Sequence, residues 1–174
     1  MWERCQEFHG HTCKGLAIGY RVGTLALDKL AAERAADEEI VAIVENASCA
    51  VDAISVVTGA TLGKGNLFLR DYGKQVYTFG LRSAKKAIRI SPKTLDWPKD
   101  LSVDELLAMP EEQFAQVTEV VWESPPKARI YPSFRCSFCG ESTSEGRLRV
   151  RDGQICCIPC AQEEPVRWDR TRGQ

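Results

Sequence analysis

Residues 8–23, which read FHGHTCKGLAIGYRVG, join a group of reactive side chains to the start of a long apolar segment. His9 and His11, the two histidines of the chain, stand at alternate positions with Cys13. Alternate side chains of an extended segment point to the same side, so we expect all three to face one pocket. Because Cys13 directly precedes a helical pattern, the helix dipole and the neighbouring Lys14 favour its thiolate. The group predicts a reactive or metal-binding site; the alternative is structural histidines and a cysteine that fills apolar space.

The apolar pattern that follows predicts a long buried helix from Gly15 to about Arg34, because apolar residues mark more than one of its faces. Gly15, Gly19 and Gly23 recur at every fourth position. Glycine weakens a helix interior, so a stripe of three indicates that another element approaches the backbone closely. Two alternatives remain open at this stage: tight packing inside one protomer, or a helix–helix seam between two protomers.

An α+β core domain is predicted over residues 1–92. The β-branched run at residues 40–46 is typical of a buried strand. A second helix is expected over Cys49–Thr58, with Ser48 as its N-cap and Gly59 as its stop. An antiparallel sheet is completed by strands at residues 67–70, 75–80 and 86–90, the first two joined by a hairpin turn at 71–74.

Residues 93–132 are predicted to form a helical connector that ends in a proline-rich linker. Ser102 and Glu105 have the spacing of a capping box, which starts one helix. Pro110 stands where it would open a second helix, which we expect to continue through EEQFAQVTEVVW to Trp122. The remaining residues, 133–174, form the last predicted domain.

This last domain carries two Cys-x₂-Cys pairs, Cys136 with Cys139 and Cys157 with Cys160, separated by seventeen residues. The spacing is typical of a zinc ribbon, in which four thiolates hold a structural Zn²⁺. So short a domain needs the metal to fold. Cys156 is the surplus cysteine, since the pair that begins at Cys157 repeats the spacing of the first.

The glycine-rich turn Gly63-Lys64-Gly65-Asn66 allows two interpretations. The first is a simple tight turn. The second is an anion site, in which backbone N–H groups and the Lys64 ammonium gather around a ligand. The residues do not match the spacing of a nucleotide-binding P-loop, because Gly65 stands where serine or threonine is required.

Composition and charge limit the classes of function. The 174 residues are 44% apolar and 27% charged, as in an ordinary globular protein. The sequence has neither a membrane-spanning run nor a signal-peptide pattern, so we expect a cytoplasmic protein with no membrane partner. Eight cysteines then indicate metal or redox chemistry before disulfides. Residues 125–174 carry nine basic and six acidic side chains, an excess too small to indicate nucleic-acid binding.

Three stretches closely resemble the FmdE family of formylmethanofuran dehydrogenase subunits: FHGHTCKGLAIGYRVG, ENASCAVDAISVVTGATLGKGNLFLRDYGK, and the C-terminal ribbon. The resemblance implies an α+β core, a homodimer, a zinc finger on a mobile connection, and an invariant cysteine in a core cleft. Cys13 stands at the position of that cysteine. Further family elements are matched by Cys49, Asp52, Lys64, Gly65, Asn66, Asp71 and Lys74.

Two positions depart from the family pattern. Lys14 stands where the family commonly has proline, and Ala60 stands where it commonly has cysteine. The second departure disfavours any disulfide mechanism that uses position 60. A reaction between Cys13 and Cys49 remains open.

The leading hypothesis is a site in the core cleft with two chemical alternatives. In the first, His9 or His11 with Cys13 and Cys49 binds Zn²⁺ or another soft divalent metal. In the second, Cys13 is a thiolate nucleophile and a histidine is its base. Asp52, one helical turn from Cys49, completes the candidate catalytic set. A small carboxylate or formyl-type ligand would be held by Lys64, Asn66 and Lys74.

The competing hypothesis is a non-catalytic accessory or regulatory protein. The ribbon would bind a protein partner, and the core would sense or carry a metal or a metabolite. The family takes its name from an operon of one-carbon metabolism with molybdenum or tungsten, which links both hypotheses to an oxidoreductase of anaerobes without assigning an activity.

Overall fold

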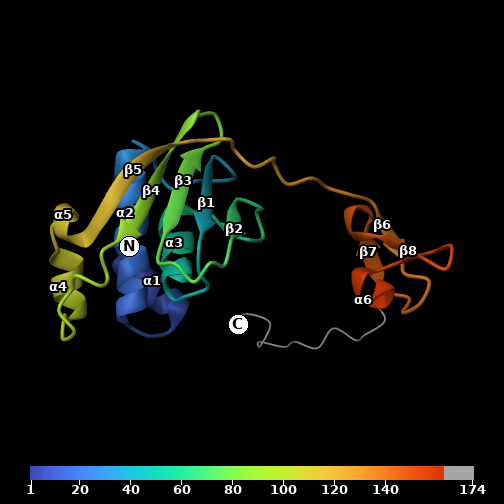
Figure 1. Ribbon diagram of the computed structural model, residues 1–174, viewed down its shortest axis with the longest axis horizontal. Helices are drawn as coiled ribbons and strands as arrows, with labels where there is room; N and C mark the ends of the chain where they lie inside the picture. The colour runs from blue at the N-terminus through green and yellow to red at the C-terminus, as the bar shows by residue number, and fades with distance from the viewer. Residues whose placement is uncertain (163–174) are drawn as a thin grey trace. The chain divides into compact units, whose positions relative to one another are not determined.

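The computed structural model describes residues 1–162, which divide into two units by their contacts, Met1–Ala128 and the part from Arg129 onward (Figure 1). The predicted ribbon domain, 133–174, therefore extends beyond the described residues. The fold is α+β, as predicted. Within residues 1–162, every helix is too short or too polar to cross a membrane.

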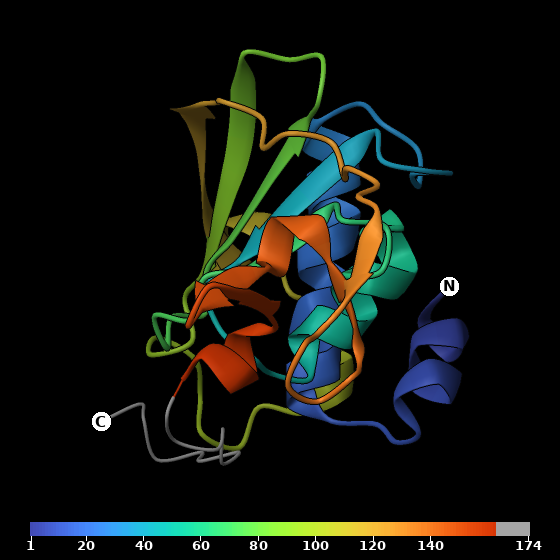
Figure 2. The same cartoon turned by 90° about the vertical axis from the view of Figure 1, so that its right-hand side faces the viewer.

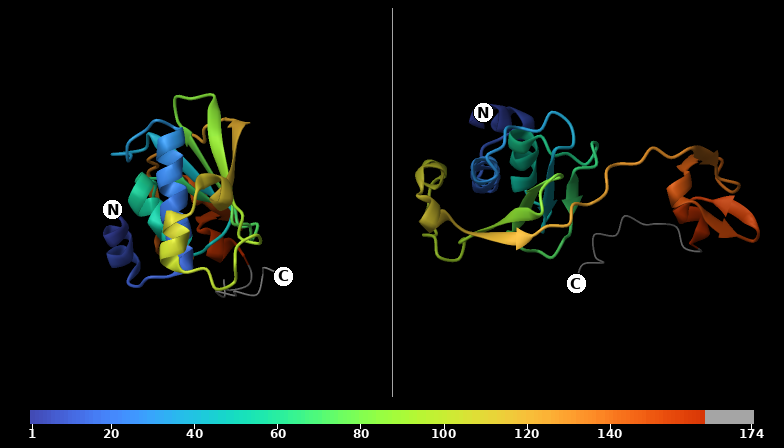
Figure 3. Two further views of the ribbon diagram at one scale, coloured as in Figure 1. Left: turned by 90° about the vertical axis from the view of Figure 1, so that its left-hand side faces the viewer. Right: turned by 90° about the horizontal axis from the view of Figure 1, so that it is seen from above.

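The first unit is built on a five-stranded sheet in the order β2-β1-β3-β4-β5. Helices α2 and α3 pack on one face of this sheet, and α1 packs against these two helices (Figure 3). On the opposite face Trp122 lies against Gly80 at the centre of a smaller apolar group. The elements are α1 Trp2–His9, α2 Lys14–Lys29, β1 Ile40–Val44, α3 Ala50–Thr58, β2 Leu67–Leu69, β3 Tyr77–Leu81, β4 Lys86–Pro92, α4 Val103–Ala108, α5 Glu111–Phe114 and β5 Ala115–Val121.

The predicted hairpin between β2 and β3 is wrong, because β1 lies between the two strands. β1 pairs in parallel with β2 and antiparallel with β3. All five residues of β1 are buried, as expected for a strand that has neighbours on both sides. The turn residues instead wrap the end of β1, where the amides of Tyr72 and Lys74 both donate to the carbonyl of Glu45.

The predicted helix over residues 111–122 is wrong beyond Phe114. Residues Ala115–Val121 form strand β5, which pairs antiparallel with β4 along its whole length. Val117, Val120 and Val121 are β-branched and favour a strand. The apolar residues at helical spacing, Phe114, Val117 and Val121, are only three and do not outweigh this preference. Part of the expected connector thus belongs to the core sheet. The predicted capping box of α4 is confirmed, since Ser102 and Glu105 exchange both hydrogen bonds.

The glycine stripe of α2 packs against α3, so the first of the two alternatives, close packing inside one protomer, accounts for it. A Cβ atom at Gly19 would lie 2.1 Å from the carbonyl oxygen of Ala50, and one at Gly23 would lie 3.0 Å from Val57. The α2 helix ends at Lys29, earlier than predicted, and α3 begins at Ala50 with no side-chain cap. Ser48 is not the N-cap.

Residues 129–162 of the second unit form two short hairpins, a 3₁₀ turn and a helical turn, which face the viewer in Figure 2. The predicted strands on either side of Asp152-Gly153 are present, and both turn residues have positive φ angles, as a tight hairpin requires. The elements are β6 Ser133–Arg135, β7 Ser142–Ser144, the 3₁₀ turn Glu145–Arg147, β8 Arg149–Arg151, β9 Gln154–Cys156 and α6 Ile158–Ala161.

The contact at Gly19 leads to a stability prediction. We expect Gly19→Ala to lower the free energy of unfolding by about 1–3 kcal/mol, because the new methyl group meets the backbone of α3. Alanine would otherwise stabilise a helix interior by about 1 kcal/mol. Urea unfolding measures the change. Gly63→Ala is the control, since a Cβ atom there meets nothing within 4 Å. Equal stability of the two variants would contradict the prediction.

Candidate functional site

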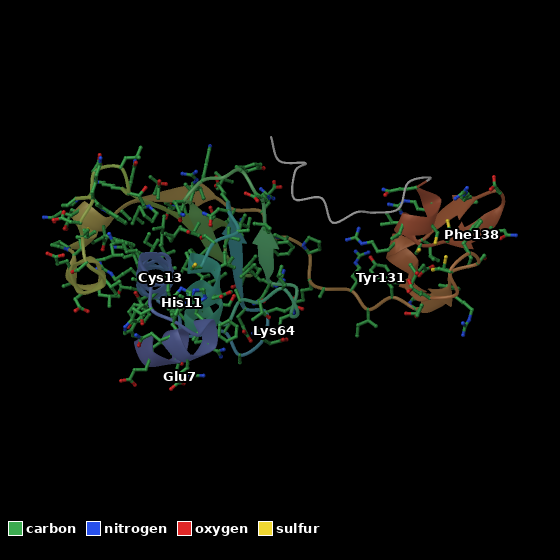
Figure 4. All side chains as sticks on the ribbon, turned by 90° about the horizontal axis from the view of Figure 1, so that it is seen from below. Glu7, His11, Cys13, Lys64, Tyr131 and Phe138 are labelled. Carbon is green, nitrogen blue, oxygen red and sulfur yellow. The ribbon has the colours of Figure 1, made fainter. Side chains whose placement is uncertain are left out.

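The two histidines and Cys13 come together at a turn between α1 and α2. His9 ends α1, and Gly10 follows in the left-handed conformation with a φ of 87°. Cys13 is the N-cap of α2 and has an extended backbone. The predicted extended segment is therefore wrong, but the predicted grouping is correct: one ligand atom from each of the three side chains lies within 4.8 Å of the others. Figure 4 shows His11 and Cys13 close together at this end of the helices.

Asp52 of α3 fixes the imidazole of His9. The Nδ1 atom of His9 lies 2.7 Å from a carboxylate oxygen of Asp52, and the histidine side chain is 11% exposed. A carboxylate at this distance favours the tautomer with hydrogen on Nδ1, which leaves the lone pair of Nε2 free. Nε2 lies 3.9 Å from the sulfur of Cys13. In that tautomer the lone pair of Nε2 lies beside the cysteine sulfur.

Cys13 is held in place by the first turn of α2, where its sulfur accepts a hydrogen bond from the amide of Leu16 at 3.3 Å. Cys49 lies beside it. A Cβ atom built on Gly15 would lie 3.8 Å from the sulfur of Cys13 and 3.7 Å from that of Cys49. Burial, together with the adjacent Cys13, raises the pKa of the Cys49 thiol. Cys49 is outside the compact group formed by the two histidines and Cys13.

The side chains of the glycine-rich turn bind other parts of the chain. The Lys64 ammonium donates to the carbonyl of Asp37 at 2.8 Å. The buried amide of Asn66 donates to the carbonyls of Asp37 and Ile40 and accepts from the amide of Thr61. These bonds fasten the turn to the segment that leads into β1. The polar groups of both side chains thus have hydrogen-bond partners within the chain and do not need a ligand. Anion binding at this turn stays a prediction.

Lys74, the third predicted ligand-binding residue, has an exposed side chain. Its hydrogen bonds to the rest of the chain are made by its backbone. Its carbonyl accepts from the buried Asn46, which also hydrogen-bonds Ser48 and Tyr77. Sequence reasoning missed this buried polar network at the end of β1. A signal was available, because the run ENAS places polar residues directly after a fully apolar strand.

The four cysteines of the second unit form the other cluster. One sulfur from each of Cys136, Cys139, Cys157 and Cys160 lies within 4.8 Å of the others. The sulfurs of Cys139 and Cys157 are 3.9 Å apart, close to the ~3.8 Å that tetrahedral Zn²⁺ with bonds of ~2.3 Å requires. Hydrogen bonds from the amides of Cys139 and Cys157 lower the pKa of Cys136 to about 6. The cluster suits a structural zinc ion.

Cys156 lies outside this cluster. Its side chain is buried, its sulfur is 3.6 Å from the carbonyl oxygen of Arg149, and burial raises its pKa. As the repeated spacing indicated, the neighbouring Cys157 takes the place beside the other three cysteines.

These features define a class: an α+β core with a His/Cys group, joined to a four-cysteine zinc finger. Residues 8–125 match the family described as "FmdE, Molybdenum formylmethanofuran dehydrogenase operon". Residues 129–165 match the family described as "Prokaryotic dksA/traR C4-type zinc finger". The chain therefore belongs to the FmdE family and carries an additional C4-type zinc finger.

Two similar proteins extend the comparison. A protein of Archaeoglobus fulgidus described as "Probable S-adenosyl-L-methionine-binding protein" is 32% identical over 193 aligned positions, which cover 91% of this chain. The chain spans about half of that protein, 51% of its length. The crystal structure of a tungsten formylmethanofuran dehydrogenase FmdE-like protein from Syntrophus aciditrophicus has the same fold, with a TM-score of 0.66 and 18% identity over 91% of this chain and 88% of that one.

The ribbon cluster gives a direct test. Cys157→Ser should release the ribbon zinc, because an alcohol replaces one of four thiolate ligands, whereas Cys156→Ser should retain it. Elemental mass spectrometry of the purified variants measures zinc per chain. Loss of zinc from the Cys156 variant alone would show that the two neighbouring cysteines have been assigned in the wrong order.

Proposed function

We propose that the core domain binds a soft divalent metal ion, with Zn²⁺ as the first candidate, through His9, His11 and Cys13. The observation that carries this proposal is the convergence of two imidazoles and one sulfur within 4.8 Å. Imidazole and thiolate are the ligands that zinc prefers. This site would be separate from the zinc finger and different from it in ligand chemistry.

The geometry around His9 supports the proposal. A nitrogen and a sulfur bound to one tetrahedral zinc ion lie about 3.6 Å apart, given the usual bond lengths. The 3.9 Å between His9 Nε2 and Cys13 Sγ is near this value. Histidines that bind metals commonly donate their other nitrogen to a carboxylate, and Asp52 supplies one.

Three protein ligands leave a coordination position for an external ligand, as in catalytic zinc sites. A metal bound there would supply Lewis acidity toward a carbonyl or carboxylate oxygen. We propose that the ligand is a small one-carbon acid or acyl compound, in line with the operon named in the family description. The relative from Archaeoglobus fulgidus makes S-adenosyl-L-methionine the second compound to test.

A second candidate function is an accessory role, in which the zinc finger binds another protein and the core carries the metal. The observation that favours it is the apolar surface of the second unit. Large apolar side chains are exposed there at Ile130, Tyr131, Phe134, Phe138, Val150 and Ile155. Turnover of a one-carbon compound by the isolated protein, lost in Cys13→Ala, would favour catalysis. Metal transfer to a partner without turnover would favour the accessory role.

Counting metal ions tests the core site. The protein purified without oxygen should hold two metal ions per chain, and Cys13→Ser should hold one, because only the core site loses a ligand. Elemental mass spectrometry measures both. Cys5→Ala is the control, since Cys5 is fully buried in an apolar group and lies outside both metal-ligand clusters. One metal ion in all three proteins would refute the core site.

The role of Asp52 gives a finer prediction. Asp52→Asn should weaken metal binding by the core about 10–100-fold, because the partner of a metal-bound histidine is changed. Competition with a chromophoric chelator measures the affinity. Glu7→Gln is the matched control: it removes a negative charge from the exposed face of α1 and leaves the His9–Asp52 pair in place (Figure 4). Equal affinity in the two variants would contradict the role given to Asp52.

A further inference from the structure

Two cysteines of the core approach each other across Gly15. The site where a Cβ atom of Gly15 would stand is 3.8 Å from the sulfur of Cys13, 3.7 Å from the sulfur of Cys49 and 3.1 Å from the Cβ atom of Cys49. Because glycine has no side chain, nothing from residue 15 separates the two thiols.

The other cysteines of the chain are placed differently. Cys136, Cys139, Cys157 and Cys160 belong to the zinc finger, and Cys5 and Cys156 are fully buried. Cys13 and Cys49 are partly exposed, so a small oxidant can reach them. They are therefore the pair of core thiols that is both adjacent and accessible.

We propose that Cys13 and Cys49 are a redox-active pair that forms a reversible disulfide. The proposal needs only the two thiols and the backbone geometry at Gly15. Its consequence for the metal rests on the proposed function: a sulfur bonded to another sulfur is no longer a thiolate ligand, so oxidation would release the core metal.

The oxidant we name is a low-molecular-weight disulfide such as oxidised glutathione. Its S–S bond is broken when the Cys13 thiolate attacks one sulfur, which forms a mixed disulfide and releases one low-molecular-weight thiol. The Cys49 sulfur then attacks the Cys13 sulfur, loses its proton and releases the second thiol. One disulfide is reduced to two thiols, and two cysteine thiols are oxidised to one disulfide.

Peptide mapping of the full chain tests the pair. Cleavage by trypsin gives a peptide 5–14 that holds both Cys5 and Cys13, and a peptide 35–64 that holds Cys49. Because Cys5 would confuse the assignment of a link to Cys13, the experiment uses a Cys5→Ser protein. This protein is treated with oxidised glutathione, its remaining free thiols are alkylated, and it is then digested with trypsin. We expect these two peptides to be linked, and the link to be absent when Cys49→Ser is added. Glutathione mixed disulfides without a link would overturn the proposal.

A second variant tests the geometry. Gly15→Ala places a methyl group beside both sulfurs, so the linked peptides should form more slowly than in the parent protein. Gly63→Ala, whose methyl group meets no neighbour, should leave the rate unchanged. An unchanged rate in Gly15→Ala would contradict the proposal that the sulfurs of Cys13 and Cys49 approach each other across residue 15.

Metal analysis of the same samples separates this proposal from the metal site. Loss of one metal ion per chain on oxidation, with the ribbon zinc retained, would support both. Linked peptides in a protein that never held a core metal would support the disulfide and refute the metal site. The third outcome is a core metal that binds normally but a protein that gives no linked peptides when a chelator first removes the metal and the protein is then oxidised. This outcome would refute the disulfide alone.

Discussion

The close packing of α2 against α3 holds the core of this protein together at the candidate site. It is achieved at Gly19, where the carbonyl of Ala50 occupies the space that any side chain would need. This contact, together with that of Gly15 against Cys49, fixes the start of α3 beside the first two turns of α2. Cys49 and Asp52 therefore meet Cys13 and His9, although about 40 residues separate the two pairs along the chain. A site assembled in this way has a rigid base, since each part lies at or beside a helix end.

The two candidate metal sites differ in the chemistry of their ligands. The ribbon offers four sulfurs at the separation of a closed tetrahedral site, which suits an ion that stabilises a small fold. The core offers two imidazoles and one sulfur, with a carboxylate behind one imidazole, which suits an ion that keeps a position for an external ligand. The helices of the core bury a continuous apolar cluster against the sheet, so the fold of the core would not need such an ion. Release of a metal from the proposed core site would therefore be compatible with a folded protein, as a redox-controlled site requires.

The strand errors have a common cause. Local signals identified β1, β2, β3 and β4. The turn signal at residues 71–74 indicates only that the chain bends there, whereas the pairing partner of each strand is decided by which strand lies beside it in space. β1 is apolar on both faces and takes an interior place in the sheet, between β2 and β3. Residues 115–121 have a few apolar residues at helical spacing and also several β-branched side chains. They form a strand because the edge of β4 offers them a hydrogen-bonding partner.

Features that depend on spacing along the chain could be predicted before the fold was known. They include the two cysteine pairs of the ribbon, the capping box at Ser102, the glycine stripe and the grouping of His9, His11 and Cys13, because each depends on a few residues of one segment. Three-dimensional packing was needed to establish that α3 covers the glycine stripe, that Asp52 holds His9, and that Lys64 and Asn66 bind the chain itself. These contacts join segments far apart in sequence, and no local pattern specifies which distant group will satisfy a given donor or fill a given gap.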